Sequence, residues 1–175
     1  LTGTAPAAGT IFTVVNGAGS TTYGNVPGPA RDARGSVGSQ YNSLAILGDG
    51  GFAYTAGDRI LRVSNSGRTT VLAGGGASSL TLASDGAAAT SVNLAAIGGI
   101  LIAGNPAVDR VYFELGCRIW SVDLVTGVLD HIAGAGTCSY TGDGDQATLA
   151  TINNVVDLAV SDNGVVYLTP ESGGA

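Results

Sequence analysis

The sequence contains no lysine, and its seven basic residues are all arginine. Charged residues make up only 11% of the chain, against about 25% in ordinary globular domains. Two explanations stay open: a surface covered by neighbouring chains or glycans, or a coding bias that favours Ala, Gly and Arg. The formal net charge is −6 and the arginines form no stripe, whereas phosphate-backbone binding relies on clustered cations. We therefore expect no nucleic-acid partner.

The chain also lacks long apolar runs and has a single histidine. No apolar run approaches the roughly 20 residues of a membrane span, so we expect no membrane insertion. One histidine, His131, supports neither a catalytic triad nor a three-ligand zinc site. The sequence thus predicts no catalytic residue, no cofactor and no enzyme activity for this segment.

The one tight carboxylate pair is Asp143 and Asp145, which flank Gly144. Carboxylate oxygens bind Ca²⁺, so the pair is a weak calcium candidate, although the further acids of a dedicated calcium loop are missing. The simpler alternative is that Asp143 accepts hydrogen bonds from N–H groups of its own loop.

What the chain has in excess is glycine, and its glycines recur in a repeated pattern. Three similar segments begin at residues 15, 72 and 132, with steps of 72 − 15 = 57 and 132 − 72 = 60: Val15-Asn16-Gly17-Ala18-Gly19, Leu72-Ala73-Gly74-Gly75-Gly76 and Ile132-Ala133-Gly134-Ala135-Gly136. Other landmarks keep this phase, since Arg59 and Arg118 are 59 residues apart, and alanines recur at 30, 89 and 147. A fixed period of this size predicts an array of similar structural units.

Each unit is predicted to contain four short strands. In the second unit these lie near residues 97–103, 110–115, 118–123 and 128–133, which are rich in β-branched and aromatic residues and are separated by Gly, Asn or Asp. The first strands, near 44–47, 100–103 and 158–160, are almost uncharged, as expected where both faces are covered. No window shows a convincing helical period.

Repeated units of four antiparallel strands are typical of a β-propeller, so we predict an all-β propeller that is incomplete in this chain. Its blade units lie at about 41–73, 96–133 and 155–175, the last incomplete, and a lone strand at 11–15 belongs to a preceding blade. All 175 residues are then part of one propeller domain.

The third unit carries a family resemblance. The run from Ile132 to Thr137, the segment Tyr140-Thr141-Gly142-Asp143-Gly144-Asp145-Gln146-Ala147-Thr148 and the strands that follow resemble an NHL repeat. NHL propellers close with about six blades, so the resemblance implies that this chain supplies about two and a half of them.

The two cysteines fall at one end of the same predicted blade. Cys117 lies in the turn before the third strand and Cys138 lies just past the fourth, and these strands run antiparallel. A disulfide is therefore predicted, which indicates an oxidising compartment and an extracellular or cell-surface location. The alternative is two unrelated buried thiols.

These observations favour a secreted or cell-surface structural scaffold. Its expected partners are other protein chains or the remaining blades of the same chain, and the many Ser and Thr residues leave O-glycans open. One alternative is a propeller enzyme of the lyase or lactonase type, with its metal site in missing blades. Another is a carbohydrate- or ligand-binding module that uses the aromatic residues Tyr23 and Tyr140.

Overall fold

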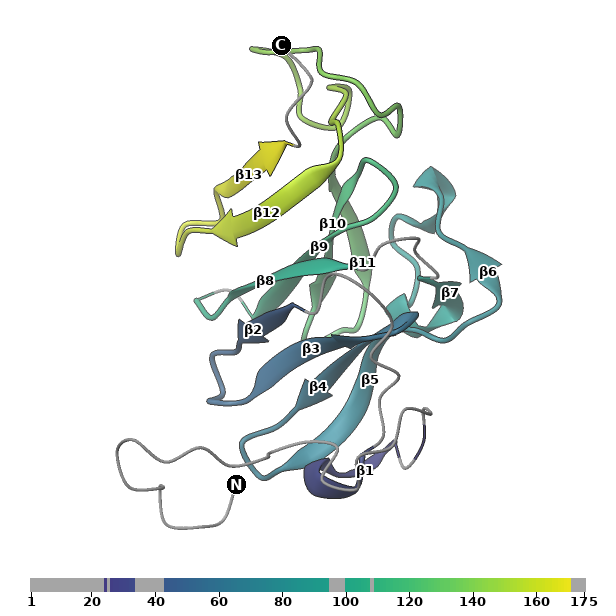
Figure 1. The fold of residues 1–175 in the computed structure, drawn as a ribbon, viewed down its shortest axis with the longest axis vertical. Coiled ribbons are helices and arrows are strands. Elements are labelled where there is room, and N and C mark those ends of the chain that lie inside the picture. The colour runs from purple at the N-terminus through teal and green to yellow at the C-terminus, as the bar shows by residue number, and fades with distance from the viewer. Residues whose placement is uncertain (1–23, 25, 34–42, 95–99, 108, 171–175) are drawn as a thin grey trace.

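The computed structural model describes residues 24, 26–33, 43–94, 100–107 and 109–170, and in this part the protein is an all-β chain of antiparallel sheets (Figure 1). The helical elements of these residues are three short 3-10 turns: η1 (Ala30–Asp32), η2 (Leu82–Ser84) and η3 (Ala89–Ser91). The all-β class predicted from the sequence is confirmed.

The first sheet is an antiparallel meander with one added edge segment. Its strands are β2 (Leu44–Ile46), β3 (Phe52–Ala56), β4 (Arg59–Val63) and β5 (Arg68–Gly74), hydrogen-bonded in chain order. A short upstream segment, β1 (Gly28–Pro29), pairs with β5 and makes the sheet order β1-β5-β4-β3-β2.

The second sheet repeats the same meander. Its strands are β8 (Leu101–Asn105), β9 (Arg110–Glu114), β10 (Ile119–Asp123) and β11 (Leu129–Ala133), in the order β11-β10-β9-β8. A third sheet contains β12 (Val155–Val160) and β13 (Val166–Pro170), and the segment between the first two sheets forms a small parallel pair, β6 (Ser78–Ser79) with β7 (Val92–Asn93).

The predicted strands agree with these elements to within a few residues. The first strand of the second unit is predicted to end at 103, whereas β8 ends at 105 because its pairing with β9 continues to Asn105 opposite Arg110. The predicted strand at 11–15 and the unit ends at 41–42, 96–99 and 171–175 lie outside the described residues. The sheets do not close into a ring within the described part, so the propeller remains a prediction.

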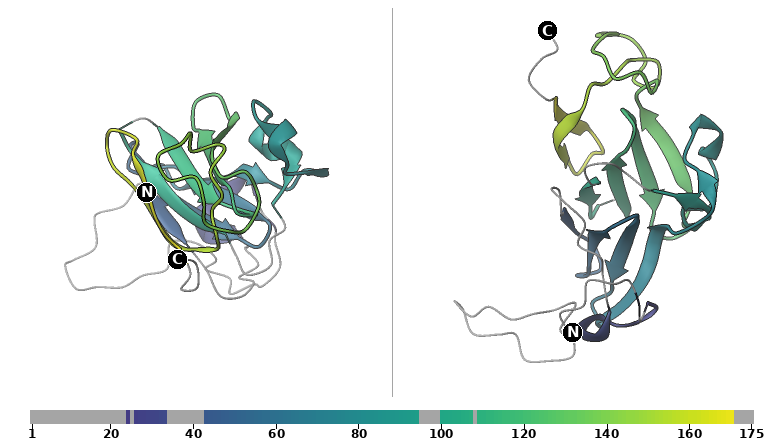
Figure 2. Two further views of the ribbon diagram at one scale, coloured as in Figure 1. Left: turned by 90° about the horizontal axis from the view of Figure 1, so that it is seen from above. Right: turned by 45° about the vertical axis from the view of Figure 1, so that its right-hand side comes forward.

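The sheets succeed one another along the long axis of the molecule, with a hydrophobic core on each side of the second sheet (Figures 1 and 2). The core between the first and second sheets includes Ile60, Phe113 and Trp120, all fully buried. The core between the second and third includes Ile119 and Leu158. Because both faces of the second sheet are covered, buried and exposed residues do not alternate along its strands. Consecutive residues 119–122 of β10 are all buried.

The first strands of the three sheets lie beside one another, with β8 between β2 and β12 (Figure 1). Gly104 permits this approach, because a Cβ at that position would lie 2.4 Å from the carbonyl oxygen of Ile46. The Ser43 hydroxyl adds a link, since it accepts from the Ile102 N–H at 3.1 Å and donates to the Ile102 carbonyl at 3.0 Å. Ser43 and Gly104 thus join two sheets whose first strands are not hydrogen-bonded as a ladder.

The repeated glycines have the same structural role in both sheets. Gly74 has φ +85° and Gly134 has φ +89°, conformations that favour glycine. A Cβ on Gly74 would lie 2.3 Å from the carbonyl oxygen of Asp58, and one on Gly134 would lie 2.4 Å from that of Cys117. The recurring motif is therefore explained by strand geometry.

Gly104→Val should destabilise the chain by about 3 kcal/mol, because the side chain must push β8 away from β2. The matched control is Ala159→Val, which adds a β-branched side chain to an exposed position of the first strand β12 and should change stability by less than about 0.5 kcal/mol. Urea unfolding, followed by the fluorescence of the single tryptophan, measures both. Equal midpoints for the two variants would show that the Gly104 contact does not hold the sheets together.

Candidate functional site

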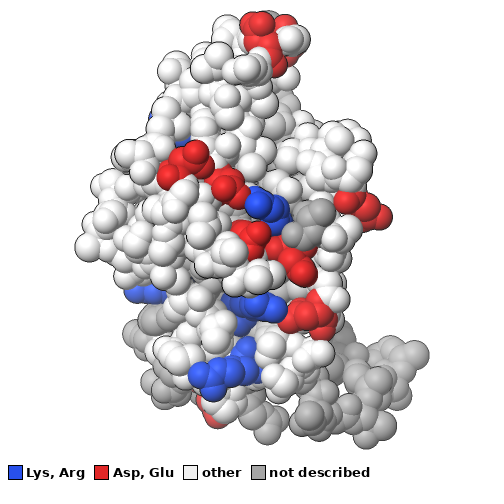
Figure 3. Space-filling view, turned by 180° about the vertical axis from the view of Figure 1, so that it is seen from behind, with Lys and Arg blue, Asp and Glu red and all other residues white. Residues whose placement is uncertain are grey.

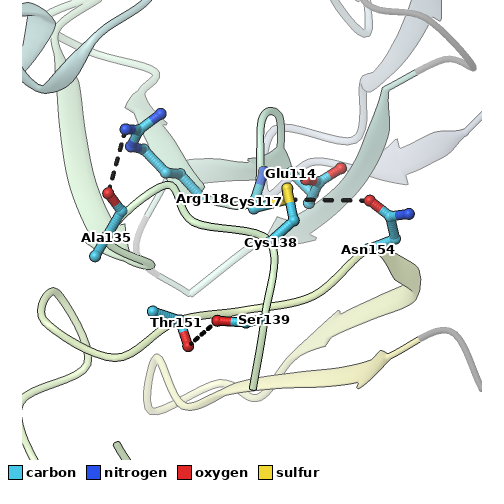
Figure 4. The surroundings of a disulfide bond; sticks show 8 residues. All are labelled: Glu114, Cys117, Arg118, Ala135, Cys138, Ser139, Thr151 and Asn154. Atoms are coloured by element: carbon cyan, nitrogen blue, oxygen red, sulfur yellow. Dashed lines mark hydrogen bonds between the residues drawn. A yellow bond between two sulfur atoms is a disulfide. The ribbon is translucent and has the colours of Figure 1, made fainter. Parts of the chain in front are cut away.

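The best-defined site is the disulfide at the end of the second sheet. The structure joins Cys117, in the turn between β9 and β10, to Cys138, in the segment after β11, with Cα atoms 5.3 Å apart (Figure 4). This is the pairing predicted from the sequence. The side chain of Cys117 is buried, whereas Cys138 is exposed, so the bond ties a surface loop to the core.

The turn that carries Cys117 has an uncommon backbone. Gly116 has φ +66° and Cys117 has φ +57°, and Leu115 donates its N–H to the Arg118 carbonyl at 3.0 Å. These are the features of a type I′ hairpin turn, which matches the twist of the flanking strands. A non-glycine residue is strained at this φ, so Cys117 occupies a place where Gly or Asn is normally preferred.

The carboxyl group of Glu114 supports this turn. Its Oε1 accepts the N–H of Cys117 at 3.0 Å, and the side chain lies beside Cys117 and Asn154 in Figure 4. Burial raises the pKa of Glu114 above its ordinary value of 4.5, and the Cys117 N–H offsets part of this effect. Asn154 Oδ1 lies 4.0 Å from the Cys117 sulfur, which is a contact without a hydrogen bond because a disulfide sulfur has no proton to donate.

The loop from 134 to 151 is folded back on itself and on β11. Gly134 and Ala135 donate their N–H groups to the carbonyls of Ala147 and Ala150, at 2.9 and 2.8 Å. Arg118 donates to the Ala135 carbonyl at 3.3 Å, within the same unit. The Thr151 hydroxyl lies 3.0 Å from that of Ser139 and 2.8 Å from that of Thr141, which closes the base of the loop.

The weak calcium candidates lie at the exposed tip of this loop. Asp143 and Asp145 are both exposed, and the turn between them is held by the Asp145 N–H bound to the Gly142 carbonyl at 3.0 Å. The described residues contain no cluster of three or more His, Cys, Asp or Glu side chains that could hold a metal. Neither a calcium site nor hydrogen bonding by the Asp143 carboxylate gains support from these contacts.

The single histidine and the candidate Tyr140 make different contacts. His131 packs its ring 5.1 Å from that of Trp120, and its Nε2 donates towards the carbonyls of Ala133 and Gly134 at 3.1 and 2.8 Å. Tyr140 is 46% exposed and adjoins the hydroxyl cluster of Ser139, Thr141 and Thr151. Tyr23 lies outside the described residues.

Ion pairs that sequence analysis missed connect the outer strands of the second sheet. Arg110 bonds to Asp130 and to the buried Ser121 hydroxyl (2.8 Å), and lies 3.6 Å from Asp123. The Asp130 bond is the main cause of the raised pKa of Arg110. Figure 3 shows acidic and basic side chains close together on the side of the molecule opposite the viewer of Figure 1. The strand register could have indicated one of these pairs, because Arg110 faces Asp123 directly across β9 and β10.

Two further carboxyl groups have lowered pKa values. The Arg62 guanidinium, 2.7 Å away, holds the pKa of Asp49 below its ordinary value. The N–H groups of Thr126 and Val125 lower the pKa of Asp123, which accepts them in the turn between β10 and β11. These groups stabilise turns and strand pairs.

Comparison with known proteins gives no identification: no family model matches the chain, and no curated protein matches it. Among the described residues, no helix has the length and apolar character that a membrane crossing requires.

Replacing both Cys117 and Cys138 by serine should lower the free energy of unfolding by about 3 kcal/mol. The disulfide spans a sequence separation of 21 residues, and closing a loop of that size removes this much unfolded-chain entropy. Urea unfolding of the double variant measures the loss, and reduced wild-type protein should match it. A variant as stable as the oxidised protein would contradict this role of the disulfide.

Glu114→Gln should change how stability depends on pH. The pKa of Glu114 in the folded protein lies above 4.5. Its contribution to the stability of the fold is therefore fully present below pH 4.5 and is lost as pH rises through the pKa of the folded state. Gln keeps an acceptor for the Cys117 N–H and stays neutral at every pH. The stability of the variant relative to wild type should therefore rise over the pH range in which Glu114 ionises, and then level off. Urea unfolding from pH 4 to pH 8 measures this difference, which isolates Glu114 from Asp49 and Asp123. A difference that is flat, or that falls with pH, would contradict the burial argument.

Proposed function

We propose that this chain is part of an NHL-type β-propeller that acts as an extracellular or cell-surface scaffold for protein–protein contacts. The observation that carries the proposal is the equivalence of two successive sheets at steps of 59 and 60 residues. Gly74 and Gly134 approach the carbonyls of Asp58 and Cys117, with 134 − 74 = 60 and 117 − 58 = 59. Repeated four-stranded meanders with neighbouring first strands are the architecture of propeller blades.

The disulfide supports the extracellular part of the proposal. Bonds of this kind persist in secreted and surface proteins and are rare where thiols are kept reduced. Cys138 is exposed, so a reducing compartment would have access to the bond. An oxidised Cys117–Cys138 pair therefore fits a protein that works outside the cytosol.

The scaffold role is supported by how the charged and polar groups are used. These ion pairs and the Glu114 hydrogen bond link strands and turns within one sheet. Such contacts favour a rigid frame, and the frame carries an exposed loop from 137 to 149 at one end of the second sheet. Rigid repeats that present exposed loops are a common basis for protein recognition.

The proposal predicts an oxidised protein outside the cytosol, in contact with other proteins. Free thiols are blocked in intact source cells, and the medium, surface-released and cytosolic fractions are then analysed by mass spectrometry. The linked Cys117–Cys138 peptide should be found in the first two fractions. A chain confined to the cytosol with both thiols blocked would overturn the location.

The contacts are tested with cross-linkers that react with carboxylates, because the chain has no lysine for amine reagents. Exposed Asp143 and Asp145 should yield cross-links to another polypeptide or to further propeller units. If every cross-link found in protein from a native source lies within residues 1–175, the scaffold role is overturned.

A further inference from the structure

Two arginines occupy equivalent places in the first and second sheets, at a step of 118 − 59 = 59 residues. Arg59 begins β4 and Arg118 directly precedes β10. Each side chain lies against the glycine-rich segment that leaves the last strand of its own sheet, because a Cβ on Gly75 would lie 2.7 Å from Arg59 Nε and one on Gly136 would lie 1.8 Å from Arg118 Nη2. The glycines therefore leave room for a guanidinium group in both units.

The two guanidinium groups differ in their partners. Arg59 forms an ion pair with Asp58, the residue before it in the turn. The equivalent of Asp58 in the second sheet is Cys117, since 117 − 58 = 59, and the side chain of Cys117 forms the disulfide. No carboxylate of the described residues lies within ion-pair distance of Arg118. Arg118 thus lacks the acid that its counterpart has.

The carboxyl group of Glu114 does not fill this role. Its Oε1 accepts the N–H of Cys117 at 3.0 Å. Figure 4 shows Glu114 on the side of the turn towards Asn154, whereas Arg118 extends towards Ala135. The turn that carries the disulfide therefore supplies no acid to the guanidinium beside it.

Part of the Arg118 guanidinium is open to a ligand. Nη2 donates to the Ala135 carbonyl at 3.3 Å, and Nε is buried without a partner. Nη1 has no hydrogen-bond partner among the described residues and, unlike Nε, is not buried. Since arginine is always charged and can only donate, Nη1 is a positioned cationic donor that solvent or a ligand can reach.

The missing acid is a property of the second unit's own sequence. Asp58 and Arg59 are neighbours in one turn, so their ion pair needs no other sheet. The Arg59 side chain stays 23% exposed although the second sheet packs against the first. A further sheet beyond β13 therefore need not cover Arg118 or provide its acid.

The chemistry of the site favours a carboxylate that belongs to a larger partner. One partly exposed ion pair changes an affinity by about fivefold at most, so Arg118 holds a small anion only weakly. The same pair contributes to orientation and specificity when it is one contact among many. Arg118 adjoins Cys117, whose disulfide partner Cys138 lies in the exposed loop from 137 to 149. Two copies of the chain, each of net charge −6, repel one another, which disfavours a second copy as the source of the acid.

We propose that Arg118 binds an acidic side chain, Asp or Glu, of a different protein, which takes the place that Asp58 has beside Arg59. The carboxylate accepts a hydrogen bond from Nη1, next to the disulfide and to the exposed loop. This inference rests on the proposed function, because it assumes that this end of the second sheet contacts another protein.

The absence of lysine allows a direct test. Arg118→Lys keeps the positive charge and gives the chain a single side-chain amine, which a carbodiimide joins as an amide to a carboxylate in contact with it. The full native polypeptide with this substitution is expressed in the source cells, treated with carbodiimide and analysed by peptide mass spectrometry. We expect an amide link from position 118 to an Asp or Glu of a different protein.

Two matched variants calibrate this experiment. Arg62→Lys should give a link within the chain to Asp49, because Arg62 Nη2 lies 2.7 Å from an Asp49 carboxylate oxygen. Arg68→Lys places the amine at an exposed arginine that has no ion pair in the described part of the chain, and it should give no link to another protein. Circular dichroism and the urea midpoint check that each variant folds like wild type.

A second measurement needs no variant. Phenylglyoxal modifies accessible guanidinium groups, and Arg118 should react about fivefold more slowly in the native assembly than in the purified chain, the effect of one ion pair. Arg68 should react at the same rate in both states. Equal rates for Arg118 in the two states would overturn the proposal.

The cross-linking result is equally decisive. The proposal is overturned if position 118 gives no link while Arg62→Lys links to Asp49, or if Arg68→Lys links to other proteins as often. Links only to the same polypeptide, or to a second copy identified by mixing in isotope-labelled chain, would also overturn it.

The tests of the proposed function do not depend on Arg118. Links from Asp143 and Asp145 to another protein, without one from position 118, refute this inference alone. A cytosolic chain whose Arg118→Lys amine links to a different protein refutes the proposed location alone.

Discussion

The structure depends on the close approach of β2 and β8. These first strands do not share a ladder, yet Gly104 brings β8 against the Ile46 carbonyl, and the Ser43 hydroxyl satisfies both main-chain groups of Ile102. Because of this approach, the faces of the first and second sheets meet and bury Ile60, Phe113 and Trp120 between them. Gly104 and the Ser43 hydroxyl thus allow the close approach of the first strands, and the apolar contact between the two sheets depends on that approach.

A second link makes each unit depend on the one before it. The segment that leaves one sheet crosses to the next and pairs with its outermost strand, as residues 86–89 do with β11. The first and last strands of a sheet are therefore both held by neighbouring units, and stability is shared along the array in the manner of repeat proteins. The third sheet shows the first of these links, through the contact of β12 with β8.

The disulfide adds a local constraint where this crossing begins. It joins the strained turn at Cys117 to the segment that leaves β11, and Glu114 accepts the N–H of the same turn. In the first sheet, Gly57 and Asp58 form the equivalent turn without a disulfide, beside an Arg59–Asp58 ion pair. Of these two equivalent turns, only the one in the second sheet carries a disulfide, and the loop from 134 to 151 follows it.

The sequence by itself determined the local features of this protein. Strand positions follow from short apolar runs separated by turn residues, the repeat follows from Gly74 and Gly134 keeping their phase, and the cysteine pairing follows from two adjacent antiparallel strands. Contacts between units were decided only by tertiary structure, because they join residues such as Ser43 and Ile102 that no local pattern relates. The raised pKa of Glu114 and the pairing of Arg110 with Asp130 also depend on packing, since burial and side-chain reach are properties of the assembled sheets.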